Sequence, residues 1–146
     1  MSSAKAWSLS HELSATRSLL LRITAVNIAR QPEKSAEHRC TLSISLPLSR
    51  GGRSDESNLC LACAWCNSYK WVQTHGFDPE TRTEVPLFHP RTQQWYEHFR
   101  WSDNGVYIIG LTVIGRTTIE TLKMNNEFIV PARRHWVEAG WHPPQL

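Results

Sequence analysis

The 146-residue sequence lacks the short signatures of several common enzyme classes. It contains no Walker loop, no dinucleotide-binding glycine fingerprint, no Ser-His-Asp ordering and no internal repeat. It also lacks a long apolar run, because the one centred on residues 19–21 is too short to cross a membrane. His11, Glu12 and Arg17 interrupt that segment, and no small-residue cleavage site follows it. We therefore expect neither a membrane partner nor a targeting signal.

The chain has few charged residues and few cysteines. A formal net charge of +3 with 20% charged residues is typical of a soluble globular chain and suits a polyanionic partner without requiring one. There are only four cysteines, and their uneven spacing favours a reducing cytoplasm over a disulfide framework. The seven tryptophans indicate a core built on aromatic packing.

Three of the four cysteines, Cys60, Cys63 and Cys66, lie within seven residues of one another. Cys63 and Cys66 form a Cys-x-x-Cys pair, whose spacing allows one turn of backbone to direct two thiolates at one metal ion. A structural zinc site needs four ligands and thus a second pair elsewhere. An iron–sulfur cluster would need a further cysteine soon after Cys66, where Asn67 stands instead. The remaining interpretation is three small buried thiols on one helix face.

The context of these cysteines favours an organised site. Gly51 and Gly52 end a loop, and polar residues at 54–57 can cap the segment that follows. Residues 58–69 are apolar enough to predict a buried helix. The expected order is a strand, a glycine loop, an asparagine, and then Cys-x-x-Cys-Asn on a helix.

This segment resembles the HNH endonucleases of bacteria that carry a zinc ribbon. The matching residues are Pro-Leu-Ser-Arg-Gly-Gly at 47–52, Asn-Leu at 58–59, Cys-x-x-Cys-Asn at 63–67, and Lys70. The resemblance extends from about Leu46 to the C-terminus, roughly two thirds of the chain. It implies an α+β fold in which a ββα-metal finger is followed by a β-hairpin and two helices.

The resemblance also implies roles for individual residues. Asn58 takes the position that orients the active-site loop, and Asn67 takes a metal-binding position on the helix. Cys63 and Cys66 supply half of a structural zinc site, and a second divalent cation such as Mg²⁺ would serve phosphodiester hydrolysis of DNA. The expected contacts to nucleic acid are the cations of the same segment: Arg50, Arg53 and Lys70.

The region before Pro47 departs from the family pattern. The general-base histidine of the family falls on Ile44, and its acidic neighbour falls on Ser43. Neither side chain accepts a proton near neutral pH. No Cys-x-x-Cys pair precedes Pro47, and neither His38 nor Cys40 has the required offset. As written, the chain lacks the base and half of the zinc site.

A displaced reading frame before about residue 46 offers one explanation. Read one frame over, codons for residues 25–29 can encode Cys-Glu-Tyr-Cys, and codons for residues 42–45 can encode Glu-His-Ile. Both hidden motifs lie at the family's spacing. We therefore hypothesise that residues 1 to about 45 are a frame-shifted translation, which predicts a poorly defined segment at 1–39 with a helix or disorder.

The rest of the chain predicts supporting structure. Prolines such as Pro86 and Pro90 exclude a regular helix across residues 71–98. The histidines of this segment could bind a phosphate or a metal ion, but lone histidines in loops are more often simply exposed to solvent. Strands at 99–101 and 106–112 form a hairpin, with Asn104 and Gly105 in a tight primed turn.

Two helices are expected after this hairpin. The first covers residues 116–125. The second covers 127–139, with Pro131 in its first turn and Gly140 as its cap. Phe128 would face the core, and Arg133 would lie with its neighbours on a basic edge.

The domain and function predictions follow. We expect an HNH-like finger at residues 40–75 and an extension at 76–146, in a cytoplasmic protein with DNA as partner and no small-molecule cofactor. The predicted function is HNH-type endonuclease activity, impaired because Ile44 replaces the base. The alternative is a non-catalytic module that binds zinc and nucleic acid on the same scaffold.

Overall fold

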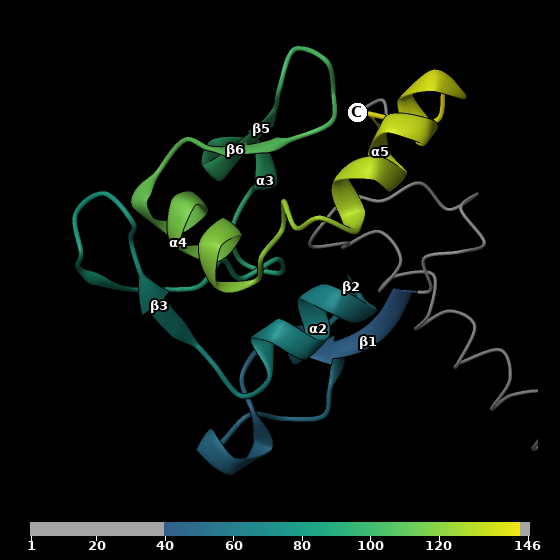
Figure 1. Cartoon of the computed structure of the whole chain (residues 1–146). Helices are drawn as coiled ribbons and strands as arrows, with labels where there is room; N and C mark the ends of the chain where they lie inside the picture. The colour runs from purple at the N-terminus through teal and green to yellow at the C-terminus, as the bar shows by residue number, and fades with distance from the viewer. Residues whose placement is uncertain (1–39, 144–146) are drawn as a thin grey trace, which may run out of the picture.

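Antiparallel pairing of short strands organises the part of the chain that the structure describes, residues 40–143 of a computed structural model (Figure 1). These residues form three two-stranded sheets and four α-helices, so the α+β class is confirmed. Within them, no helix is both long and apolar enough to span a membrane. The N-terminal predictions for residues 1–39 lie outside the described residues.

The first unit consists of β1 (Cys40–Ile44), β2 (Leu59–Cys63) and α2 (Ala64–Lys70). The two strands pair from Cys40 with Cys63 to Ile44 with Leu59, and α2 contacts both of them (Figure 1). The prediction of a single helix from 58 to 69 was wrong in its first half. Residues 59–63 pair with β1 instead, and the helix begins only after Cys63.

Residues 71–98 contain more structure than the prolines suggested. Strands β3 (His75–Phe77) and β4 (Glu84–Pro86) form a hairpin, and α3 (Trp95–His98) is a single short turn of helix. Pro86 stands at the last position of β4, where a missing backbone donor does least harm to the pairing. The exclusion of a regular helix is confirmed up to Gln94.

The predicted hairpin near residue 100 is present, but its turn differs from the prediction. Strand β5 (Phe99–Trp101) pairs with β6 (Ile108–Gly110), so the connection spans six residues, whereas the predicted strands left four. Gly105 has φ +72°, whereas Asn104 is not left-handed. The backbone N–H of Gly105 donates to Ser102 O at 2.7 Å, which closes a wider turn before the strand resumes.

The two C-terminal helices are α4 (Val113–Thr121) and α5 (Ile129–Glu138). Helix α4 begins three residues earlier than predicted because the Thr112 side chain accepts a hydrogen bond from Gly115 N at 3.1 Å. Helix α5 begins at Ile129, two residues later than predicted, with Pro131 in its first turn as expected. Gly140 follows α5 with φ +71°, as expected of a glycine cap.

The core joins the first unit to the later elements. Cys60, Cys63 and Cys66 belong to one buried cluster with the aromatic residues Phe88, Trp95 and Phe99. Helix α4 packs on β3, β4 and β6 (Figure 1). At its first turns Arg116 binds the buried Asp78 through two hydrogen bonds of 2.9 Å. The ββα unit is therefore held by an aromatic core rather than standing alone.

Candidate functional site

The loop between β1 and β2 is fixed by Asn58. Its side chain, 6% exposed, accepts from Leu46 N at 2.7 Å and donates to Leu46 O and Arg53 O, both at 2.8 Å. The loop contains the 3-10 turns η1 (Leu48–Arg50) and η2 (Glu56–Asn58). A Cβ at Gly52 would stand 1.8 Å from Leu46 O, so only glycine fits there. Asn58 and Gly52 together hold the two ends of the loop against each other.

Ile44, at the end of β1, occupies the position that the resemblance assigns to the general base. Its carbonyl oxygen accepts a hydrogen bond of 2.7 Å from Lys70 Nζ. The backbone at position 44 is therefore tied to the last turn of α2. The hydrocarbon side chain of Ile44 offers no group that could accept a proton from water.

Lys70 is buried, although it was predicted as a contact to nucleic acid. The residue is 5% exposed, and burial lowers the pKa of its ammonium group, while the nearby Cys60 thiol opposes that shift. Burial likewise raises the pKa of Cys60. The Lys70 head group lines a pocket, so an anion would reach it through that opening rather than on the open surface.

The other two predicted cations lie on the surface of the loop. Arg50 is exposed and its Nη1 donates to Thr74 Oγ1 at 3.1 Å. Arg53 is exposed and pairs with Asp55 at 2.6 Å. Arg50 carries a charge that no carboxylate among the described residues neutralises, whereas Arg53 is partly neutralised by its neighbour.

Cys63 and Cys66 are brought together at the start of α2. Cys63 is the N-cap residue, and its Sγ accepts a hydrogen bond from Cys66 N at 3.3 Å. The two residues are 2% and 3% exposed. Cys40 is the residue paired with Cys63 in the strand register. Asn67 follows on α2 and is half-buried, and its side chain makes no hydrogen bond within residues 40–143.

The donor set fits a thiolate metal site only in part. Among the described residues, no three His, Cys, Asp or Glu side chains gather closely enough to hold a metal ion. Two thiols at Cys-x-x-Cys spacing on a capped helix suit one half of a tetrahedral zinc site, and the other half would have to come from elsewhere in the chain. The pair cannot complete such a site by itself.

Sequence reasoning placed Arg133 on an exposed basic edge, and that prediction was wrong. Arg133 is 0% exposed, and burial lowers its pKa to about 10, with the Cys66 and Cys63 thiols opposing that shift. The guanidinium thus remains charged at neutral pH. Its spacing from Ile129 and Trp136, at i−4 and i+3, places it on the buried face of α5. That periodicity was a signal available in the sequence.

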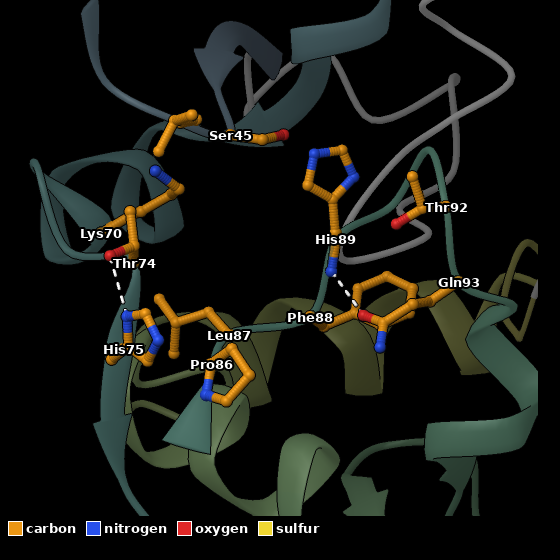
Figure 2. A pocket seen from close by; sticks show the side chains of 11 residues that line it. Ser45, Lys70, Thr74, His75, Pro86, Leu87, Phe88, His89, Thr92 and Gln93 are labelled. Carbon is orange, nitrogen blue, oxygen red and sulfur yellow. Dashed lines mark hydrogen bonds between the residues drawn. The ribbon is translucent and has the colours of Figure 1, made fainter. Parts of the chain in front are cut away.

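A pocket of about 380 Å³ opens beside β1 and α2 (Figure 2). Ser45 and Lys70 line it from the first unit, and His75, Phe88 and His89 line it from the segment that follows. His89 Nδ1 accepts from Arg91 N at 3.3 Å, so the proton of the neutral ring lies on Nε2. Burial lowers the pKa of His89. His89 is therefore a half-buried ring on the pocket wall whose Nδ1 is engaged by the backbone.

Comparison with protein-family models, with curated proteins and with solved structures finds no match to this chain. The geometry of the site and the sequence motif are thus the grounds on which a function rests.

Proposed function

We propose that this chain is built on the ββα-metal scaffold of HNH endonucleases and acts on DNA. The observation that carries the proposal is the joint placement of two asparagines. Asn58 holds the loop after β1 by three hydrogen bonds. Asn67 lies on the helix capped by Cys63, and its side chain makes no hydrogen bond within residues 40–143. The strand pair, the loop that Asn58 holds and the helix after Cys63 support this proposal.

The proposed activity is metal-dependent hydrolysis of DNA phosphodiester bonds, in an impaired form. A divalent cation such as Mg²⁺, when bound, would supply Lewis-acid and template chemistry to such a reaction. Asn67 is the residue proposed to help hold it, and Arg50 to bind the DNA backbone. Ile44 supplies no base, so water would be activated poorly. General-base catalysis typically contributes about 10²- to 10⁴-fold to the rate.

The experiment restores the missing group with Ile44→His. Supercoiled plasmid is incubated with Mg²⁺ and the full-length wild type or variant, and nicking is followed over time. We expect slow or undetectable nicking by wild type and a gain on the order of 10²-fold for Ile44→His. Ile44→Ala controls for the loss of the isoleucine side chain. Adding Asn67→Ala to Ile44→His should abolish the gain.

The second candidate function is a module that binds zinc and nucleic acid without catalysis, and Ile44 favours it. If Ile44→His binds DNA as wild type does but never nicks it, the endonuclease proposal fails and the binding module stands. If neither protein binds DNA at low salt, both proposals fail, because both require the nucleic acid as partner.

A further inference from the structure

Lys70 is a buried cation with which no carboxylate of residues 40–143 forms an ion pair. Its ammonium group has three N–H donors, and the structure gives it one acceptor, Ile44 O at 2.7 Å. The nearby Cys60 is a neutral thiol, because its Sγ donates to Ser43 O at 3.8 Å and burial raises its pKa. A buried charge is costly unless an opposite charge accompanies it. Lys70 therefore keeps both charge and donors for an anion.

The pocket of about 380 Å³ brings further donors to the same opening (Figure 2). The ring of His89 lines it, and since Arg91 N engages His89 Nδ1, Nε2 is the ring nitrogen left for a ligand. Thr74 and His75 line it as well and hydrogen-bond to each other at 3.0 Å. None of the described residues that line the pocket is Asp or Glu. The lining thus combines donors with positive charge, which favours an anionic ligand.

Arg50 adds a second positive charge at the edge of the pocket. Its Nη1 donates to Thr74 Oγ1 at 3.1 Å, so the exposed guanidinium lies beside a residue of the lining. Lys70, in contrast, is 5% exposed and lies inside. A phosphate in the middle of a DNA strand is flanked by nucleotides on both sides and can meet Arg50 at the surface. A phosphate that reaches Lys70 has to belong to a strand end or to a small molecule.

The size of the pocket and its apolar wall indicate a ligand larger than a bare anion. Its 380 Å³ lie within the range of about 300 to 1,000 Å³ that is typical of sites for small organic molecules. Pro86, Leu87 and Phe88 supply the apolar part of the lining. Phe88 N donates to Thr118 Oγ1 at 2.8 Å, and the Phe88 ring packs on Phe99 with centroids 5.1 Å apart. This wall is therefore fixed to the core, and a sugar or base can lie against it.

We propose that this pocket binds the phosphomonoester group of a nucleotide, with Lys70 compensating its charge and His75 and His89 as further hydrogen-bonding partners. The nucleotide is either free or the phosphorylated end of a DNA strand, since both present the same group. A phosphomonoester carries nearly two negative charges at neutral pH, more than the single charge of a phosphodiester. The described lining includes neither Ile44 nor Asn67, so the inference goes beyond the proposed hydrolytic centre and does not rest on nuclease activity.

Isothermal titration calorimetry on the full-length protein in metal-free buffer tests the pocket without any hydrolysis. We expect thymidine monophosphate to bind, and thymidine, which lacks the phosphate, not to bind. Inorganic phosphate should bind more weakly than the nucleotide, because it leaves the apolar wall uncovered. Lys70→Met should weaken nucleotide affinity about 10- to 100-fold, as expected for the loss of a hydrogen bond to a charged group. Lys123→Met removes an exposed lysine that does not line the pocket and should change nothing.

A second pair of variants keeps the test decisive if Lys70→Met does not fold. His75→Ala removes an exposed side chain of the pocket, and His135→Ala removes an exposed histidine of α5. Only His75→Ala should weaken nucleotide binding, and both proteins should keep the wild-type circular dichroism spectrum.

Competition with DNA distinguishes the two sources of the phosphate. If the site takes a strand end, a single-stranded oligonucleotide phosphorylated at both ends should displace thymidine monophosphate far better than the same oligonucleotide with hydroxyl ends. Equally weak displacement by both assigns the site to free nucleotides. The proposal is overturned if wild type does not bind thymidine monophosphate, if thymidine or inorganic phosphate binds as tightly as the nucleotide, or if a folded Lys70→Met binds the nucleotide as wild type does.

Discussion

Replacing Asn58 with alanine should lower the stability of the protein far more than replacing Asn67, the other asparagine of the motif. The Asn58 side chain makes three hydrogen bonds to backbone groups of the loop, at 2.7, 2.8 and 2.8 Å, and is 6% exposed. Each such bond contributes about 0.5 to 1.5 kcal/mol, and a partner left buried and unsatisfied adds to the cost. We therefore expect Asn58→Ala to lower the free energy of unfolding by about 2 to 4 kcal/mol.

Urea unfolding followed by tryptophan fluorescence measures this change. Asn67→Ala is the matched control, because its side chain makes no hydrogen bond in residues 40–143 and its loss should change the free energy of unfolding by less than about 0.5 kcal/mol. Asn58→Asp keeps the acceptor for Leu46 N but faces two carbonyl oxygens with no donor, so it should lose at least as much as the alanine variant. Equal losses for Asn58→Ala and Asn67→Ala would refute the assignment of the loop-holding role to Asn58.

Four other expectations follow from the same structure. Gly52→Ala should cost more stability in urea than Gly51→Ala, because its Cβ meets backbone at 1.8 Å whereas the Gly51 Cβ meets nothing within 4 Å; equal costs would contradict this. Hydrogen bonds from Arg116 hold the pKa of Asp78 below its ordinary value of 3.8, so the stability it contributes is present above that pH and is lost as pH falls through the lower, folded pKa. Asp78→Asn should therefore flatten acid unfolding, and the exposed Asp103→Asn should not. If Arg50 binds a DNA phosphate, Arg50→Gln should reduce the slope of log affinity against log salt by about 0.9, and an unchanged slope would exclude that contact. The gene sequence over codons 20 to 50 should encode Cys-x-x-Cys and Glu-His-Ile in the displaced frame; any other reading rejects the frame-shift hypothesis.

Local signals predicted the C-terminal elements well. Strand formers on both sides of Gly105 gave the β5–β6 hairpin, and Pro131 and Gly140 marked the two ends of α5. These features depend on backbone preferences that act within a few residues. The prediction of a tight turn was wrong because hydrogen bonds among Ser102, Asn104 and Tyr107 favour a wider loop.

The elements that depend on distant partners could not be read from the chain alone. Residues 59–63 are apolar enough for a buried helix or a buried strand, and pairing with β1 decided the outcome. The β3–β4 hairpin was missed because its strands have only three residues each. Phe128 was expected in the core but is 52% exposed, since its ring stacks on Trp65 instead.

The candidate site also contains residues that local sequence could place and one that it could not. The motif residues 58, 63, 66 and 67 belong to one hairpin and its helix, so their spacing in sequence largely determines their places in the fold. Arg133 comes from α5, some seventy residues later, and no local pattern links it to the cysteines. Only its place on the apolar face of the helix distinguishes it from Arg134.

The burial of the cysteines in the aromatic core has a kinetic consequence. Cys60, Cys63 and Cys66 are at most 3% exposed, so a thiol-reactive reagent can modify them only during an opening of the structure around them. That opening must separate the cysteines from the aromatic residues of the same cluster, Phe88, Trp95 and Phe99. The rate of alkylation under native conditions would thus report how often this core opens.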